Sequence, residues 1–178
     1  MAICKLNRSL LKDTSCGYSL PQIVKIYLAN FDDYTTSLGE DSGNCESVTA
    51  ITSADTAATW YQIDPAKNSA SFEDALVVND NGTKYRTHTL TFTVNGTYDA
   101  CLHMDFDAFS LGKYMAVIKT AEGNYLMLGR LSGLEAETAT LSGGSDNNGM
   151  QIVLSANVTE SVVPVTGSAI NVVTGQSE

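Results

Sequence analysis

Carboxylates are the side chains of this sequence whose types and spacing could support chemistry. Asp105 and Asp107 lie two residues apart, as do Glu135 and Glu137, and paired carboxylates serve as acid and base in glycoside hydrolases. The sequence contains no G-x-S-x-G, H-E-x-x-H, P-loop or G-x-G-x-x-G motif that would direct such groups to a known reaction. We therefore expect both pairs to form solvated or interface faces and expect no enzyme activity, with a carboxylate hydrolase as an alternative.

The sequence also contains no clear motif for a metal-binding or phosphate-binding site. Residues 146–148 (D-N-N) offer oxygen ligands of the kind that calcium prefers, but the spacing of an EF-hand and its closing glutamate are absent. The glycines at 143–144 are followed by neither a lysine nor a helix pattern, so we interpret them as a hairpin loop. Of the two histidines, His88 and His103, we interpret His103 as a packing residue and not as a ligand or base. The four cysteines lie far apart and form no C-x-x-C pair: Cys4, Cys16, Cys45 and Cys101. We expect no metal and no cofactor.

Charge is distributed unevenly along the 178 residues, which are most simply read as one domain. The net charge is −10, yet Lys5, Arg8, Lys12 and Lys25 give the amino end a basic character, whereas residues 30–80 hold ten acids and one base. This asymmetry indicates either contacts between copies of the chain or solubility alone. An acidic surface argues against a protein that grips nucleic acid, because contacts to phosphate dominate that affinity. No segment has the apolar length of a membrane span.

The pattern at residues 112–130 predicts the central element of the fold. Apolar runs at 114–118 and 125–128 flank a turn containing Gly123, which is typical of a β-hairpin. In the first run, Met115 and Val117 point to one face while Tyr114, Ala116 and Ile118 point to the other. Apolar residues on both faces indicate a strand that is covered on both sides.

Further strands and one helix are predicted around this hairpin. Sparse charge and abundant Ser, Thr, Asn and Gly favour a mainly β protein. We expect strands at 22–29, 47–52, 57–63, 70–78, 84–94, 134–141 and 150–158. Tyr98, Leu102, Phe106 and Phe109 recur at helical spacing, which predicts a helix over about 98–111 that covers one face of the hairpin. We expect strands 22–29 and 150–158 to cover its other face, and residues 30–46 to form a long loop.

The strand at 84–94 alternates most clearly. One face carries Leu90 and Phe92, and the opposite face carries a row of threonines: Thr87, Thr89, Thr91 and Thr93. A threonine row keeps high β-propensity while presenting hydroxyls and no charge. This row is either an ordinary solvent face or a polar wall that lines a channel.

The order of segments resembles the tail-tube (major tail) proteins of tailed bacteriophages. The resemblance covers roughly residues 20–160 and rests on an ordered pattern instead of a diagnostic motif. Its segments are Q-I-V-K-I-Y-L-A-N-F-D-D, W-Y, S-A-S-F-E-D-A-L, G-K-Y-M-A-V-I-K-T-A-E-G-N-Y-L-M-L-G-R and S-G-G…N-G-M-Q-I-V-L-S-A. The four cysteines and residues 1–20 have no counterpart that we can place in that family.

The resemblance implies a β-sandwich or barrel of the phage tail-tube type, with one flanking α-helix at about 98–111 and a long inter-subunit loop. Residues 1–20 would form an N-terminal arm, 21–158 the tube domain, and 159–178 a C-terminal arm or edge strand. The threonine row would be a lumen wall. The candidate inter-ring residues are Asp32, Asp33, Glu40 and Asp41.

As to function, the resemblance implies a structural virion protein, made in the host cytoplasm, whose main partner is another copy of itself. Copies would assemble into stacked, typically hexameric rings that contact neighbouring tail proteins, bind no membrane and let DNA pass without specific binding. Two alternatives remain: a ring-forming tail connector or terminator of the same fold, and a non-catalytic β-sandwich module that binds carbohydrate or a host surface.

Overall fold

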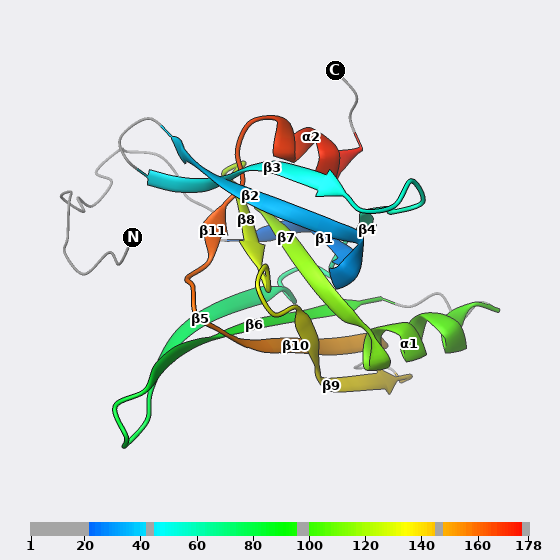
Figure 1. The fold of residues 1–178 in the computed structure, drawn as a ribbon. Coiled ribbons are helices and arrows are strands. Elements are labelled where there is room, and N and C mark those ends of the chain that lie inside the picture. The colour runs from blue at the N-terminus through cyan, green and yellow to red at the C-terminus, as the bar shows by residue number, and fades with distance from the viewer. Residues whose placement is uncertain (1–21, 42–44, 96–99, 145–147, 176–178) are drawn as a thin grey trace, which may run out of the picture.

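The computed structural model describes residues 22–41, 45–95, 100–144 and 148–175. The N-terminal arm predicted for residues 1–20 therefore lies outside the described residues. The protein is mainly β, as the composition predicts, and its named strands pair in antiparallel fashion (Figure 1).

The elements follow one another along the chain with short connections. The strands are β1 (Ile23–Asn30), β2 (Tyr34–Asp41), β3 (Cys45–Ser53), β4 (Tyr61–Ile63), β5 (Ser71–Val78), β6 (Lys84–Val94), β7 (Lys113–Thr120), β8 (Tyr125–Leu128), β9 (Leu134–Ser142), β10 (Gly149–Val158) and β11 (Val163–Pro164). A short 3-10 turn, η1 (Phe31–Asp33), joins β1 to β2. The helices are α1 (Leu102–Leu111) and α2 (Ser168–Thr174).

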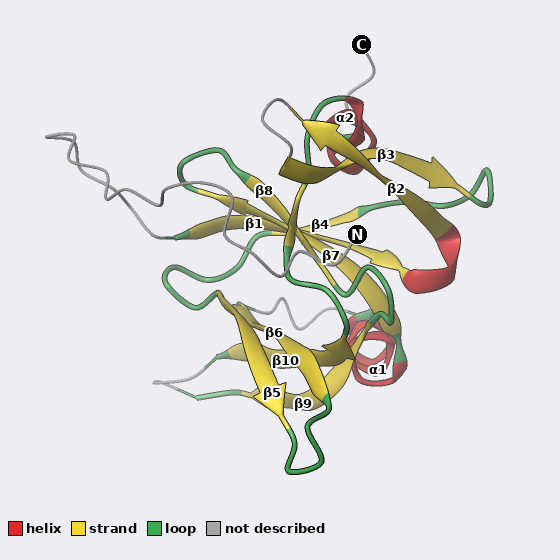
Figure 2. Ribbon diagram, turned by 60° about the vertical axis from the view of Figure 1, so that its left-hand side comes forward, coloured by secondary structure: helices red, strands yellow, loops and turns green. Residues whose placement is uncertain are grey.

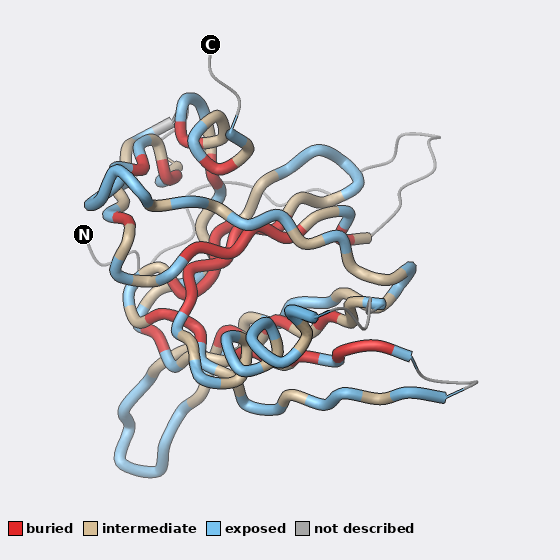
Figure 3. Tube along the Cα trace, turned by 90° about the vertical axis from the view of Figure 1, so that its right-hand side faces the viewer, coloured by how far each residue is buried: buried red, intermediate tan, exposed pale blue. Residues whose placement is uncertain are grey.

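The predicted central hairpin is confirmed as β7 and β8. Val117 pairs with Met127, and Gly123 adopts a φ of 88° in the turn, a conformation that favours glycine. β7 is buried on both faces, as its unalternating apolar sequence predicts. Ala116 and Ile118 belong to one hydrophobic core cluster, and Met115 and Val117 belong to a second. Buried residues accordingly run through the middle of the molecule (Figure 3).

The first core cluster is enclosed by β1, β7 and a four-stranded layer in the order β9, β10, β6, β5. Leu90 and Phe92 of β6 and Ile152 and Leu154 of β10 supply four of its fully buried side chains. Helix α1 is confirmed, and it packs Phe106 and Phe109 against the same cluster. Figure 2 shows the four strands as one layer with α1 beside it.

The predicted arrangement around the hairpin is partly wrong. β1 does not cover a face of β7, because it lies beside β7 in the same sheet and pairs with it from Ile23 to Asn30. β10 lies on the same side as the helix, since both contribute to the first core cluster. The opposite face of β7 is covered by the β2–β3 hairpin and α2, which form the second cluster (Figure 1).

The long loop expected at residues 30–46 is also wrong, because most of this segment is η1 and β2. β2 pairs with β3 from Tyr34↔Ser53 to Asp41↔Cys45. Its sequence Y-T-T-S-L-G-E-D is rich in β-formers, but it buries only Tyr34 among the residues whose burial is described, so it lacks the apolar alternation that marks a strand.

The C-terminal residues pack onto the rest of the same chain. β11 adds to the edge of β8 through Val163↔Met127. Val165, Ala169 and Val173 are buried in the second cluster, the last two from α2, a helix that the sequence pattern did not predict. The hairpin turn predicted at 79–82 is present, but only Gly82 has a positive φ, so the paired positive φ angles of a type I′ turn are not adopted.

Candidate functional site

The predicted threonine row lies on the outward face of the four-stranded layer. Directly paired residues in antiparallel strands share a face, so the pairing register identifies the neighbours of each threonine. We call the resulting surface the threonine face. It consists of Ser71, Glu73, Ala75 and Val77 on β5; Tyr85, Thr87, Thr89, Thr91 and Thr93 on β6; Gln151, Val153, Ser155 and Asn157 on β10; and Glu135, Thr138 and Thr140 on β9.

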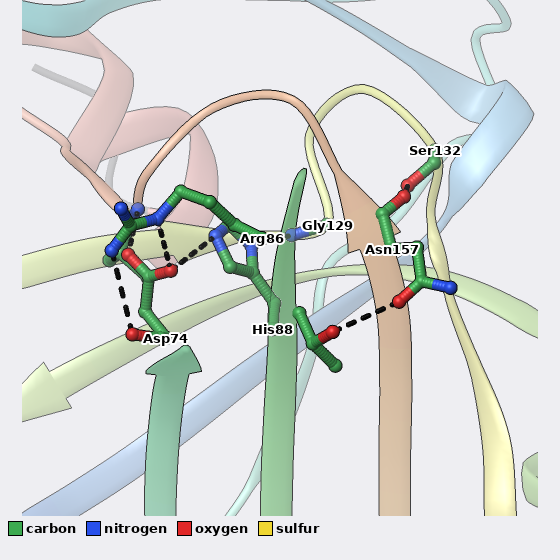
Figure 4. Close-up of polar contacts among 8 residues, drawn as sticks. Asp74, Arg86, His88, Gly129, Ser132 and Asn157 are labelled. Atoms are coloured by element: carbon green, nitrogen blue, oxygen red, sulfur yellow. Dashed lines mark hydrogen bonds and ion pairs between the residues drawn. The ribbon is translucent and has the colours of Figure 1, made fainter. Parts of the chain in front are cut away.

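The threonine face is mostly polar, with Ala75, Val77 and Val153 as its apolar residues, and it carries no basic side chain of its own. Its only charged residues are Glu73 and Glu135. Lys113 lies at its margin, where its ammonium group is 3.4 Å from the Glu135 carboxylate. Thr87 and Asn157 are joined across two strands by a 3.0 Å side-chain hydrogen bond (Figure 4). A polyanion next to this surface would meet hydroxyls, amides and two carboxylates, and so would find no phosphate-binding group.

The two margins of this layer are unpaired strand edges. Within the described part of the chain, β5 pairs only with β6. β9 pairs with β10 along its length. On its other side its only strand partner among the described residues is β7, at Leu134 and Glu135, and helix α1 also contacts β9. Residues 136–142 of β9 and the outer side of β5 therefore present backbone groups without a strand partner among the described residues. Such edges are templates for pairing with another chain.

The candidate inter-ring residues lie at two different places. Asp32 and Asp33 are in η1, where Asp33 accepts a 2.8 Å hydrogen bond from the Asn30 side chain. Glu40 and Asp41 are at the far end of β2, and Glu40 lies directly opposite Glu46 of β3. Directly opposed like charges destabilise a strand pair, so this end of the hairpin is electrostatically unfavourable in the isolated chain. The β2–β3 hairpin and the threonine face lie on opposite sides of the molecule (Figure 1).

A buried polar cluster, which the sequence reasoning missed, lies behind the threonine face. Arg86 Nε donates a 2.6 Å hydrogen bond to Asp74 Oδ1, and the Val162 backbone N–H donates a 3.0 Å bond to Asp74 Oδ2 (Figure 4). The imidazole of His88 is 1% exposed, and its Nε2 lies 3.6 Å from Asp74 Oδ1. Its Nδ1 accepts a hydrogen bond from the Gly129 N–H, which assigns the proton of the neutral ring to Nε2. The signal in the sequence was the pair of polar residues, Arg86 and His88, on the inward face of β6.

Burial and charge act on this cluster in identifiable ways. Burial alone would raise the pKa of Asp74, but the hydrogen bonds from Arg86 and from the Val162 N–H outweigh it and lower that pKa below its ordinary value. Burial lowers the pKa of His88, although the Asp74 carboxylate opposes the shift. His88 does not line any of the four best-formed cavities among the described residues. The cluster joins β5, β6 and the C-terminal segment and acts as a structural tie.

Neither of the two carboxylate pairs, Asp105 with Asp107 or Glu135 with Glu137, has both of its members lining the same cavity. Asp107 lies 3.1 Å from His103 on the outer side of α1, and Glu135 faces Lys113. Asp105 lines a cleft without Asp107. Among the described residues no group of three or more His, Cys, Asp or Glu side chains is placed to hold a metal ion. Asp146 and Asn147 of the calcium hypothesis lie outside those residues.

Comparisons with models of protein families, with curated proteins and with solved structures found no match. No helix in the described parts of the chain combines the length and apolar character that crossing a membrane requires. The threonine face and the two strand edges beside it are therefore the surfaces from which we infer a function.

Proposed function

We propose that this chain is a structural protein whose copies join side by side into closed rings that stack into a tube, with the threonine face lining the channel. One observation carries the proposal: a polar face without basic side chains spans a layer that ends in an unpaired edge on either side. β5 of one copy would pair with β9 of the next. An interface between two different edges repeats around a ring until the rotation closes, and closure removes the exposed edges.

The chemistry of the threonine face fits a conduit for DNA. A wall that binds phosphate would hold a passing polyanion, whereas hydroxyls and amides with two acidic residues offer it no ion pair. In this proposal the β2–β3 hairpin lies on the outside of the ring, because it is opposite the threonine face. Its acidic end, with Glu40 and Asp41, and the η1 residues Asp32 and Asp33 would then contact the adjacent ring. The resemblance to tail-tube proteins of tailed bacteriophages supports the same assignment, and on that basis we propose that the assembly belongs to a virion tail.

Negative-stain microscopy of the purified full-length chain tests this function. We expect rings or tubes with a central hole, together with sedimentation of species much larger than a 19.0 kDa monomer. A chain that stays monomeric at high concentration contradicts the proposal. A ring-forming connector or terminator differs in copy number per particle: a tube component is present in many stacked rings and a terminator in one.

A further inference from the structure

The largest of the four best-formed clefts among the described residues lies between α1 and the end of β1. Its volume of about 680 Å³ is within the range of roughly 300–1,000 Å³ that is typical of small-molecule sites. Apolar side chains from β1, β4, β6, α1 and β10 line it: Leu28, Ile63, Val94, Leu102, Phe109 and Met150. All six belong to the first core cluster or pack against it, so the floor of the cleft is an accessible part of that core.

The charged side chains around this apolar floor are acidic. Asp64 and Asp105 line the cleft, both are exposed, and none of the described lining residues is basic. Within the described ranges neither carboxylate forms an ion pair. Lys25 reaches the margin, but it donates its 3.1 Å hydrogen bond to Gln62 Oε1 and not to a carboxylate. Tyr61 of β4 also lines the cleft and is 57% exposed, so part of its ring is open to solvent.

These features select one class of ligand. The apolar floor favours a ligand that can remove apolar surface from water. The two carboxylates attract a positive charge, and the face of an exposed tyrosine ring attracts one as well. We propose that the cleft binds a small organic cation, an ammonium group carried on an apolar aliphatic or aromatic body. The body covers the apolar floor, and the ammonium group stays at the margin with Asp64, Asp105 and Tyr61.

This binding goes beyond the proposed function and does not depend on it. Val94 and Met150 are directly paired residues of β6 and β10 whose side chains line the cleft. Their neighbours along the strands, Thr93 and Gln151, belong to the threonine face, and successive side chains of a strand point to opposite faces. A ligand in the cleft is therefore on the other side of the layer from the proposed channel.

Equilibrium dialysis of the full-length chain against three probes of similar size tests the proposal. The probes are 2-phenylethylamine, 2-phenylethanol and 3-phenylpropanoate, which carry a cation, a neutral hydroxyl and an anion on the same phenylethyl body. We expect the chain to bind the amine at least about tenfold more tightly than the alcohol, and the propanoate most weakly, because the carboxylates and the tyrosine ring add to the apolar contact. Equal binding of the three probes, or binding of none, contradicts the proposal.

Charge removal locates the site. Asp64→Asn with Asp105→Asn should reduce the preference for the amine over the alcohol to about twofold or less, because the charges that favour the cation are gone. Asp107→Asn with Glu137→Gln is the matched control, since it removes two exposed carboxylates that do not line the cleft. It should retain the preference. An equal loss in both double variants would assign the preference to the net charge of −10 and contradict a site in the cleft.

Filling the cleft gives an independent check. Ala108 lines it from an exposed position of α1, so Ala108→Trp should fold and should weaken the binding of both the amine and the alcohol by about fivefold or more. Met104→Trp, on the same helix but outside the cleft and 74% exposed in the parent residue, should bind both as the wild type does. Wild-type binding in Ala108→Trp contradicts the proposal. Loss of amine binding leaves ring assembly untouched, and a monomeric chain that binds the amine contradicts only the proposed ring function.

Discussion

At the scale of residues, Asp74 connects three parts of the fold. Its carboxylate accepts hydrogen bonds from Arg86 on the neighbouring strand and from the backbone of Val162 near the C-terminus, and it faces the His88 ring. A second ion pair nearby, Arg130 with Glu160, holds the β8–β9 connection to the same C-terminal segment through a 2.9 Å bond. These groups position the C-terminal residues against the layer that carries the threonine face.

Asp74→Asn should destabilise the chain. The amide leaves the Arg86 guanidinium without an anionic partner, and hydrogen bonds to charged groups contribute about 1.5–3 kcal/mol. We expect the free energy of unfolding in urea to fall by about 2 kcal/mol. Glu73→Gln is the control: the neighbouring residue on β5 is exposed, and its substitution should change stability by less than about 0.5 kcal/mol. Equal effects of the two substitutions would show that Asp74 has no such role.

His88 makes stability depend on pH in a defined direction. Its pKa is lower in the folded chain than its ordinary value of 6.5, so the folded state binds fewer protons than the unfolded state near that pH. The contribution of His88 is therefore complete above about pH 6.5 and is lost as the pH falls below it. Asp74, whose pKa is also lowered, adds a loss in the same direction only at more acidic pH, below its ordinary value of 3.8.

The variant His88→Gln isolates this effect. Between pH 7.5 and pH 5.0 the loss of unfolding free energy should be smaller in His88→Gln than in the wild type. His103→Gln, at the other and exposed histidine, should retain the wild-type loss. Identical pH dependence in all three proteins would contradict the assignment of a neutral, buried imidazole.

At the scale of elements, the sequence predicts those strands that bury an apolar face. β6 and β10 alternate clearly because one side faces the core, and β7 is apolar throughout because both sides do. β2 was not predicted because its sequence consists largely of threonine, serine and acidic residues and has no alternating apolar pattern. α2 escaped because its S-A-I-N-V-V-T sequence is short and rich in β-branched residues, and tertiary packing of Ala169 and Val173 overrides that propensity.

Helix α1 depends on its aromatic contacts to stay in place. The Phe109 ring lies 6.0 Å from the Phe92 ring and 6.5 Å from that of Tyr114, measured between centroids. Phe109→Ala should lower the unfolding free energy by about 2–3 kcal/mol, below the 3–5 kcal/mol of a fully buried phenylalanine because this ring is half-buried. Hydrogen exchange in α1 should accelerate as well. Met104→Ala on the exposed side of the same helix should change neither quantity measurably.

At the scale of the whole molecule, two strand edges have no strand partner within the described parts of the chain, and both lie beside the threonine face. The spacing of the threonines alone suggested a polar wall. The neighbours of β6 in the sheet, and the edges that remain unpaired, could not be predicted in the same way. They depend on contacts between segments that are far apart in sequence. The pairing of β6 with β10, residues 84–94 with 149–158, is such a contact. The cleft beside α1 was likewise beyond prediction, because six separate elements build it.

Lysine substitutions can distinguish the role of the β9 edge in strand pairing from the role of the threonine face as a channel wall. Thr138→Lys with Thr140→Lys places charges along the unpaired edge of β9, and edge lysines oppose strand pairing. We expect this variant to fold normally and to lose self-association by sedimentation. Thr89→Lys changes the same residue type within the layer and should still assemble, while placing a basic group on the channel wall. Loss of assembly in both variants, or in neither, would argue against pairing through β9.

The central claim is that the threonine face lines a channel formed by β5–β9 pairing between copies. Electron cryomicroscopy of the assembled full-length chain tests it most directly, because a reconstruction locates each strand relative to the axis. We expect a continuous inner wall in which β5 of each copy lies beside β9 of its neighbour and Thr87, Thr89, Thr91 and Thr93 face the lumen. An assembly whose lumen is lined by α1 or by the β2–β3 hairpin, or whose β5 and β9 edges stay apart, would contradict it.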